Sequence, residues 1–280
     1  MNNTLIKTFS IFLITALTLL TFCNTKKADK PQKVLDHEIE IKLIKRKIVT
    51  YKDIEPITDS LVLPIDYLNV ISLKGLPVKE KKQRFVDLIL PAILIAKEEY
   101  RERLNWVNSL ESKDSLSARE IKLLGDLMKK YQAKSIPDLK SRLTTHPVSI
   151  VLAQASIESG WGTSRFFTKA NNVFGVWSFD PNDPRIPSLS TRWGKHMYLY
   201  KYSSLSQSVD DYFKLLATRR PFEQFRKMRL KTDDPYELVN YLKDYSEKGE
   251  EYVQLLKSQI RHNNFTRYDH YVIDPGYFIK

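Results

Sequence analysis

The residues with the clearest chemical potential lie in one short stretch, from Gln154 to Gly175. Within it, Glu158 directly precedes a Ser-Gly-Trp-Gly turn. A carboxyl group can donate a proton to the leaving oxygen of a glycosidic bond when apolar surroundings raise its pKa. Trp161 supplies apolar surface close by, and the flanking glycines let a sugar approach the backbone. On spacing alone, a solvated glutamate at a helix end beside a core tryptophan is the more common arrangement, and half of a sugar-cleaving site is the alternative.

A helix is expected to position this acid. Pro147 suits the first turn of a helix, where its missing N–H costs nothing. Val151 and Ala155 belong to the buried stripe of this helix, and Glu158 follows them by seven and three residues. Glu158 is therefore expected at the edge of the buried face, close to Gly160, where the helix ends.

The surrounding chain is expected to be α+β and mostly helical. Apolar spacing and capping signals predict further helices over Lys79 to about Leu110, Ser117 to about Tyr131, Ile136 to Leu143, about Leu205 to Arg219, Asp234 to Tyr245, and Glu250 to His262. Period-two alternation predicts a strand within 37–51 and a β-hairpin or small sheet within 173–202. The segment 54–76 is expected to be extended over the domain.

The first residues resemble an export signal. The apolar run from Phe9 to Cys23 is shorter than the ~20 residues that a membrane-spanning helix needs. It ends at Leu20-Thr21-Phe22-Cys23, which resembles a bacterial lipobox, although Phe22 stands where a small residue is usual. We expect a lipoprotein anchored through acylated Cys23 in the cell envelope, facing the periplasm. The alternative is an uncleaved N-terminal anchor helix.

Charge and cysteine content limit the partners. The 280 residues carry a formal net charge of +12, which suits a polyanion. The cations are spread along the chain without a nucleic-acid-binding motif, so an anionic envelope polymer is expected and nucleic acid is not. Cys23 is the only cysteine, which excludes an internal disulfide. No metal or cofactor is expected, because the histidines lack ligand spacing and no phosphate loop occurs.

Two motifs together identify a family. Residues Gln154–Arg165 and Asn171–Gly175 resemble the signature of bacterial endo-β-N-acetylglucosaminidases of glycoside hydrolase family 73. The segments Leu76–Phe85 and Tyr245–Tyr252 are similar to those of Bax-type members of this family. The resemblance covers roughly Ile54 to Phe265.

The resemblance implies a lysozyme-like, mostly helical fold with a small β-hairpin beside the active-site cleft, and a monomer is expected. It also implies hydrolysis of the β-1,4 bond between N-acetylglucosamine and N-acetylmuramic acid in peptidoglycan. Glu158 matches the catalytic acid, and Tyr245 matches a tyrosine near the reacting sugar. The residues expected to bind substrate are Trp161, Asn172, Phe174, Trp177 and Tyr252.

The second catalytic group stays open at this point. The family places it on the hairpin at a variable position, and the candidates here are Asp180 and Asp183. Acid and base carboxyl groups about 6.5–9.5 Å apart lead to inversion through water. A route through the N-acetyl group of the substrate needs no protein base. Both aspartates are also ordinary turn residues.

Five segments are expected: a signal peptide with its lipobox (1–23), a tether and N-terminal extension (24–53), a helical N-terminal part of the domain (54–146), the glucosaminidase core (147–265) and a C-terminal tail (266–280). Two other functions fit the same composition. One is a module that binds peptidoglycan without cleaving it, and the other is a surface lipoprotein that binds anionic polymers.

Overall fold

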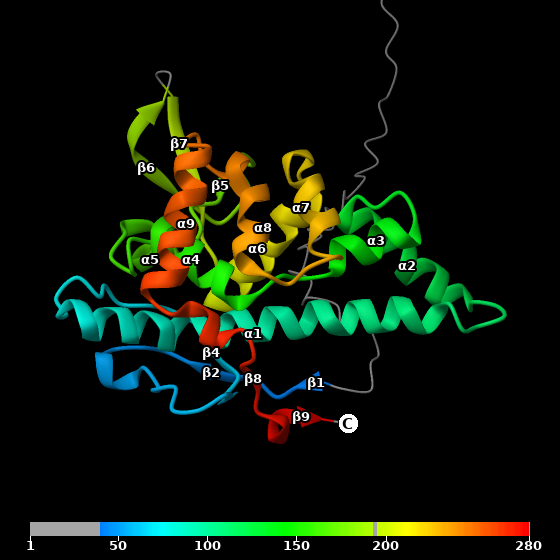
Figure 1. Ribbon diagram of the computed structural model, residues 1–280, viewed down its shortest axis with the longest axis horizontal. Helices are drawn as coiled ribbons and strands as arrows, with labels where there is room; N and C mark the ends of the chain where they lie inside the picture. The colour runs from blue at the N-terminus through cyan, green and yellow to red at the C-terminus, as the bar shows by residue number, and fades with distance from the viewer. Residues whose placement is uncertain (1–39, 193–194, 280) are drawn as a thin grey trace, which may run out of the picture. The chain divides into compact units, whose positions relative to one another are not determined.

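The computed structural model describes residues 40–192 and 195–279, which all belong to the compact unit Leu35–Lys280 (Figure 1). The predicted signal segment and Cys23 lie outside these residues. Within the described ranges, no helix combines the length and the apolar character needed to cross a bilayer.

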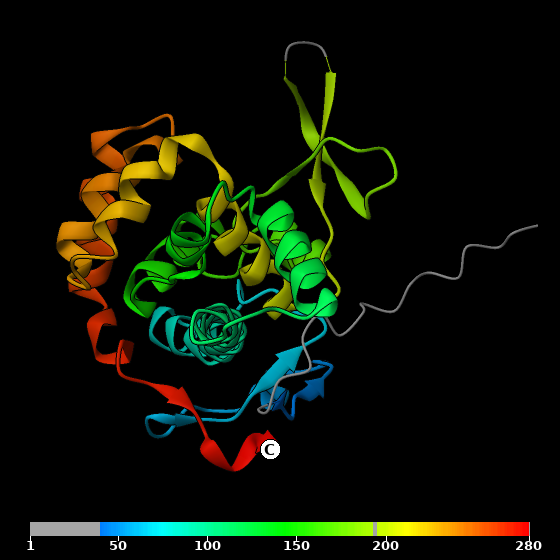
Figure 2. The same cartoon turned by 90° about the vertical axis from the view of Figure 1, so that its right-hand side faces the viewer.

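Helix α1 (Val78–Leu110) is the longest element, and the fold is built around it. Its residues from Phe85 to Ala96 are buried on every side. Figures 1 and 2 show the other helices on one side of α1 and short strands on the opposite side. The other helices are α2 (Ala118–Tyr131), α3 (Ile136–Leu143), α4 (Val148–Glu158), α5 (Arg165–Ala170), α6 (Leu205–Thr218), α7 (Glu223–Met228), α8 (Pro235–Leu238) and α9 (Glu250–His262).

The short strands bring the two ends of the described chain together. Strand β1 (Glu40–Ile41) pairs with β9 (Phe278–Ile279), and β3 (Leu61–Val62) pairs with β8 (Val272–Ile273). Strand β2 (Ile44–Arg46) pairs with β4 (Ile65–Tyr67), which packs against α1. The C-terminal segment thus joins the N-terminal segment in covering one side of α1.

A separate three-stranded sheet has the order β5-β7-β6, with antiparallel neighbours. Its strands are β5 (Trp177–Ser178), β6 (Arg185–Arg192) and β7 (Lys195–Tyr200). Strands β6 and β7 form a hairpin that extends away from the helices (Figure 2). The mostly helical α+β class, with its small hairpin, is therefore confirmed.

Helix α4 lies in the core of the helical side. Every residue from Val148 to Ser156 is buried, and the helix contacts α1, α9 and the 3-10 turn η4 (Phe265–Tyr268). The predicted bounds of α3 and α9 match the structure. The helix predicted through Tyr245 is corrected: α8 ends at Leu238, and the chain continues as the 3-10 helix η3 (Val239–Tyr245).

Candidate active site

The start of α4 is fixed by a residue from the C-terminal segment. Pro147 occupies the N-cap position and offers no side-chain cap. Asp269 takes over this role: its carboxylate accepts hydrogen bonds from the Ser149 backbone N–H at 2.7 Å and from the Ser149 hydroxyl at 2.9 Å. A negative charge at a helix N-terminus is favourable, so this contact anchors the helix that carries Glu158.

The end of α4 is a tight turn that needs glycine. Glu158 is the last helical residue, and Gly160, Trp161 and Gly162 follow with φ of 57°, 56° and 75°. A Cβ on Gly162 would lie 3.0 Å from Cδ1 of Leu73, so this position requires both a left-handed backbone and an absent side chain. The turn closes the helix directly behind the acid.

Glu158 is half-buried and receives a hydrogen bond from one neighbour. The Tyr252 hydroxyl donates to its Oε1 at 2.8 Å. Burial raises the pKa of Glu158, and the bond from Tyr252 opposes this rise only in part. The negative end of the α4 dipole acts in the same direction as burial. A carboxyl group that stays protonated to higher pH can serve as a general acid.

Aromatic rings pack together in the core beside Glu158. Tyr245, the expected site tyrosine, stacks on Tyr252 with ring centroids 5.7 Å apart and an interplanar angle of 7°. Phe174 stacks on Tyr212 at 4.1 Å, and the Tyr212 and Tyr245 rings lie 6.3 Å apart. Phe174 is 4% exposed and Tyr252 is 2% exposed, so both rings act mainly from within the core.

A chain of buried polar side chains runs behind Tyr252. The Gln154 amide donates to the Tyr252 hydroxyl at 3.1 Å and accepts from the Tyr212 hydroxyl at 2.6 Å. His146 Nε2 lies 2.9 Å from the same Tyr212 hydroxyl. The sequence interpretation missed this chain. Its only local signal is the i, i+4 spacing of Gln154 and Glu158 on one helix face.

The two candidate second carboxylates lie in different environments at the base of the hairpin. Asp183 is half-buried, and its carboxylate accepts a hydrogen bond from the Ser178 hydroxyl at 2.8 Å. It also contributes, after burial, to a raised pKa of Tyr200. Asp180 is exposed and accepts from the backbone and side chain of Asn182 at 2.9 and 3.0 Å, as a turn residue does.

Asn172 is buried and bonded to the sheet. Its amide donates to the carbonyls of Val176 and Tyr200 at 3.0 and 2.9 Å and accepts from the Val176 N–H at 2.9 Å. These bonds join the end of β7 to the start of the sheet. The Asn172 side chain therefore positions the sheet that carries Asp183.

Trp161 packs toward α1. Its ring lies 5.4 Å from the Phe85 ring and 5.9 Å from the Phe265 ring, and the Lys82 ammonium lies 4.8 Å from its centroid. Trp177 and Phe179 are placed differently, since they are 39% and 72% exposed at the base of the sheet. These two rings offer apolar surface that solvent can reach.

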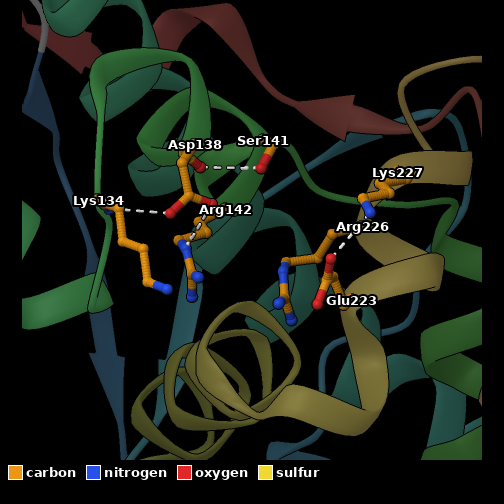
Figure 3. Close-up of a pocket in the computed structure, with 7 residues that line it drawn as sticks. All are labelled: Lys134, Asp138, Ser141, Arg142, Glu223, Arg226 and Lys227. Carbon is orange, nitrogen blue, oxygen red and sulfur yellow. Dashed lines mark hydrogen bonds and ion pairs between the residues drawn. The ribbon is translucent and has the colours of Figure 1, made fainter.

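A pocket elsewhere in the molecule contains two acids whose pKa values are shifted in the direction opposite to that of Glu158 (Figure 3). It has a volume of about 290 Å³ and is lined by Lys134, Asp138, Ser141, Arg142, Glu223, Arg226 and Lys227. Burial acts to raise the pKa of Asp138, but hydrogen bonds from the Lys134 N–H and from Arg142 lower it by more. The pKa of Asp138 is therefore lowered. Lys227 lowers the pKa of Glu223. Both acids stay ionised, so neither suits proton donation.

The two arginines of that region cap helix α6. Arg142 donates to the Ala217 carbonyl at 2.7 Å, and Arg226 donates to the carbonyls of Leu216 and Arg219 at 2.9 Å each. Carbonyls at a helix C-terminus need such donors. The region is therefore explained by helix capping, whereas Glu158 combines partial burial with a raised pKa.

Comparisons with known proteins point to the same segment. Residues 133–265 match the family model of mannosyl-glycoprotein endo-beta-N-acetylglucosaminidase. Protein Bax of Escherichia coli (strain K12) is 29% identical over 197 residues, which cover 65% of this chain and 70% of Bax. The exo-glucosaminidase LytG of Bacillus subtilis (strain 168) is 35% identical over 74 residues, 25% of this chain and 26% of LytG.

Two solved structures are also similar. The catalytic domain of the autolysin Auto from Listeria monocytogenes is 20% identical with a TM-score of 0.39, over 60% of this chain and 97% of that domain. A glycoside hydrolase domain of Salmonella typhimurium FlgJ is 22% identical with a TM-score of 0.35, over 50% of this chain and 95% of that domain.

Proposed function

We propose that this protein is a peptidoglycan hydrolase, because residues 133–265 match the family model of mannosyl-glycoprotein endo-beta-N-acetylglucosaminidase. The bond cut is the β-1,4 linkage from N-acetylglucosamine to N-acetylmuramic acid, and Glu158 is the general acid. One observation carries the proposal. Glu158 ends a buried helix, and burial raises its pKa beside the stacked rings of Tyr245 and Tyr252.

The proposed reaction begins with protonated Glu158. Its proton passes to the glycosidic oxygen as the bond from that oxygen to the anomeric carbon breaks. Tyr252 holds the other carboxyl oxygen, which keeps the acid oriented during the transfer. Tyr245, stacked on Tyr252, is proposed to lie beside the reacting sugar. Water completes the hydrolysis by adding to the anomeric carbon.

We propose Asp183 rather than Asp180 as the base that takes the proton of this water. Ser178 fixes the Asp183 carboxylate, whereas Asp180 is engaged by Asn182 in a turn. Burial and, after it, the charge of Asp183 raise the pKa of Tyr200. The ring centroids of Tyr200 and Tyr202 lie 4.8 Å apart. The alternative route uses the N-acetyl group of the substrate in place of Asp183.

The proposed glycan surface combines exposed and buried rings. Trp177 and Phe179 are exposed enough to contact the apolar faces of sugars. Phe174 contributes from the core through its stack on Tyr212, and Asn172 holds the sheet in place through its hydrogen bond to the Tyr200 carbonyl. Trp161 supports the turn after the acid through its contacts with α1.

The proposed location is the cell envelope, where peptidoglycan lies, with Cys23 as the acylated anchor. The net charge of +12 supports attraction to a polymer that carries peptide carboxylates. Labelling cells with a fatty-acid probe tests the anchor: wild type should incorporate the probe and Cys23→Ala should not. Equal labelling of both would contradict acylation at Cys23.

Digestion of purified sacculi tests the activity. Wild type should release fragments, and mass spectrometry should find N-acetylglucosamine at their reducing ends. Reducing-end N-acetylmuramic acid would instead indicate a muramidase, and 1,6-anhydro ends a lytic transglycosylase. Fragment lengths separate internal cuts from the terminal cuts that the name of LytG describes for that protein. Binding without any fragment would favour a non-catalytic module.

Paired variants test the base. Asp183→Asn should lower the rate by about 10²-fold or more, and Asp180→Asn should retain most of it. If both variants keep the wild-type rate, the protein supplies no base from this loop, and the substrate-assisted route is favoured.

A further inference from the structure

The hydrogen bonds behind Glu158 form a chain in which every proton points toward the acid. An amide oxygen only accepts, so the Tyr212 hydroxyl must donate to Gln154 Oε1, 2.6 Å away. That hydroxyl has a single proton, and its second neighbour, His146 Nε2 at 2.9 Å, must therefore donate to it. With this orientation of the Gln154 amide, the proton of His146 lies on Nε2.

The same reasoning continues to the acid. The Gln154 NH₂ group donates to the Tyr252 hydroxyl at 3.1 Å, which leaves the hydroxyl proton of Tyr252 for Glu158 Oε1 at 2.8 Å. Reversing the chain would put the His146 proton on Nδ1, which has no hydrogen-bond partner among the described residues. A buried N–H without a partner is rare, so the direction toward Glu158 is favoured.

The surroundings keep the far end of the chain neutral. His146 is 2% exposed, and burial, with Arg229 and Lys97 nearby, lowers its pKa well below the usual value. The ammonium of Lys97 donates to the His146 carbonyl at 2.6 Å. The titratable groups that interact with Glu158 itself are Tyr212, Tyr245 and Tyr252, and burial raises the pKa of all three.

We propose that Gln154, Tyr212 and His146 are positioning residues that fix, through Tyr252, which oxygen of Glu158 carries the acid proton. Oε1 receives the bond from Tyr252 and acts as the accepting oxygen, so the proton is confined to Oε2. A carboxylic acid without this bond could hold its proton on either oxygen and would present it to the glycosidic bond part of the time. This inference rests on the proposed role of Glu158 as general acid.

Tyr212→Phe tests the chain with the least disturbance. Tyr212 is fully buried and does not contact solvent, and the new ring keeps the stacking on Phe174. Without the hydroxyl, the Gln154 amide can turn its oxygen toward Tyr252 and divert the Tyr252 proton from Glu158. We expect kcat to fall roughly tenfold with KM unchanged, because the acid loses orientation while the glycan surface is untouched.

The decisive readout is the pKa of the Glu158 carboxyl group. It is measured from the ¹³C chemical shift of the carboxyl carbon, and this signal is assigned by its absence in Glu158→Gln. Donated hydrogen bonds favour the charged form, so Tyr212→Phe should raise this pKa and Tyr252→Phe should raise it further. The high-pH limb of kcat should move upward in the same order. Tyr131→Phe is the matched control, since it removes an equally buried hydroxyl that receives a bond from Arg103.

The proposal is overturned if folded Tyr212→Phe titrates Glu158 at the wild-type pH, as the Tyr131→Phe control should. If Tyr212→Phe does not fold, Tyr252→Phe tests the last bond of the chain, and an unshifted titration there overturns the proposal, because the other three residues act only through this bond. Failure of the proposed function appears separately, as wild-type protein that releases nothing from sacculi. The NMR titration needs no turnover and still decides whether the chain controls the Glu158 proton.

Discussion

Glu158 lies where burial makes its charge unfavourable. Burial raises its pKa, and the hydrogen bond from Tyr252 replaces only part of the solvation that the carboxylate loses. An acid in such a position lowers the stability of the folded protein once it ionises. The burial of Glu158 therefore has a thermodynamic consequence that can be measured.

We expect Glu158→Gln to raise the free energy of unfolding at pH 7. The folded-state pKa of Glu158 is above its unfolded value, so the folded protein loses stability as pH rises through the interval between the two. The neutral amide removes this loss and still accepts the bond from Tyr252. Urea unfolding at several pH values measures the effect. The gain should vanish below about pH 4, where the unfolded carboxyl is also protonated. An equal gain at all pH values would contradict ionisation as its cause.

The sequence predicted the position of Glu158 at the end of a helix, but not its supporting contacts. Glu158 followed from a local motif and from the helix that precedes it. Tyr252, which bonds Glu158, lies 94 residues away along the chain, and Tyr212 lies 58 residues from Gln154. Periodicity shows that such tyrosines face a core, but it carries no information about which buried hydroxyl meets which amide.

At the scale of elements, the helices were predicted well because their signals are local. Ser117 and Glu120 form the expected capping box, and Gly249 precedes α9 at its predicted start. The strands were harder, since their length depends on distant partners. The predicted strand within 37–51 is two pieces, β1 and β2, because β9 and β4 offer only short partners.

The sheet that carries Asp183 depends on Asn172. We expect Asn172→Ala to cost about 2–3 kcal/mol, because it leaves buried backbone groups of Val176 and Tyr200 without partners. Amide hydrogen exchange should also become faster in β5 and β7. Asn182→Ala, in the exposed turn of the same sheet, is the control and should change stability by less than about 0.5 kcal/mol. Equal effects of the two variants would contradict this role of Asn172.

The turn after α4 gives a matched pair of glycine variants. Gly162→Ala should destabilise the protein by about 1–3 kcal/mol, because its φ is 75° and the new Cβ would lie 3.0 Å from Leu73. Gly125 lies within α2, and its Cβ would meet nothing within 4 Å. Gly125→Ala should therefore stabilise by about 0.5–1 kcal/mol. Chemical unfolding measures both changes. An unchanged free energy of unfolding in Gly162→Ala would contradict the requirement for glycine at this position.

At the scale of the whole molecule, segments expected to be a tether and a tail contribute to the fold. Strands β8 and β9 pair with β3 and β1, and Ile273 is 3% exposed within the core. Asp269 caps α4 and so links the C-terminal segment to the helix of Glu158. These pairings could not be predicted, because two-residue strands leave almost no pattern in a sequence.

Removing the C-terminal segment should therefore affect the distant acid. We expect deletion of residues 266–280 to lower stability by several kcal/mol, since it removes the cap of α4 and buried apolar contacts such as that of Ile273. Deletion of residues 275–280 alone loses the 3-10 helix Pro275–Tyr277 and β9 but keeps Asp269 and β8, and should cost much less. Thermal unfolding of the two truncated proteins distinguishes them. Equal stability of both truncations would contradict the role assigned to Asp269 and β8.

The most direct test of the central claim compares wild type with Glu158→Gln on purified sacculi. Both proteins should bind, and the variant should be at least as stable at neutral pH. Wild type should release fragments ending in N-acetylglucosamine, and the variant should be slower by about 10²–10⁴-fold, the usual contribution of a general acid. Release of the same fragments by Glu158→Gln at the wild-type rate would contradict the assignment of Glu158 as the catalytic acid.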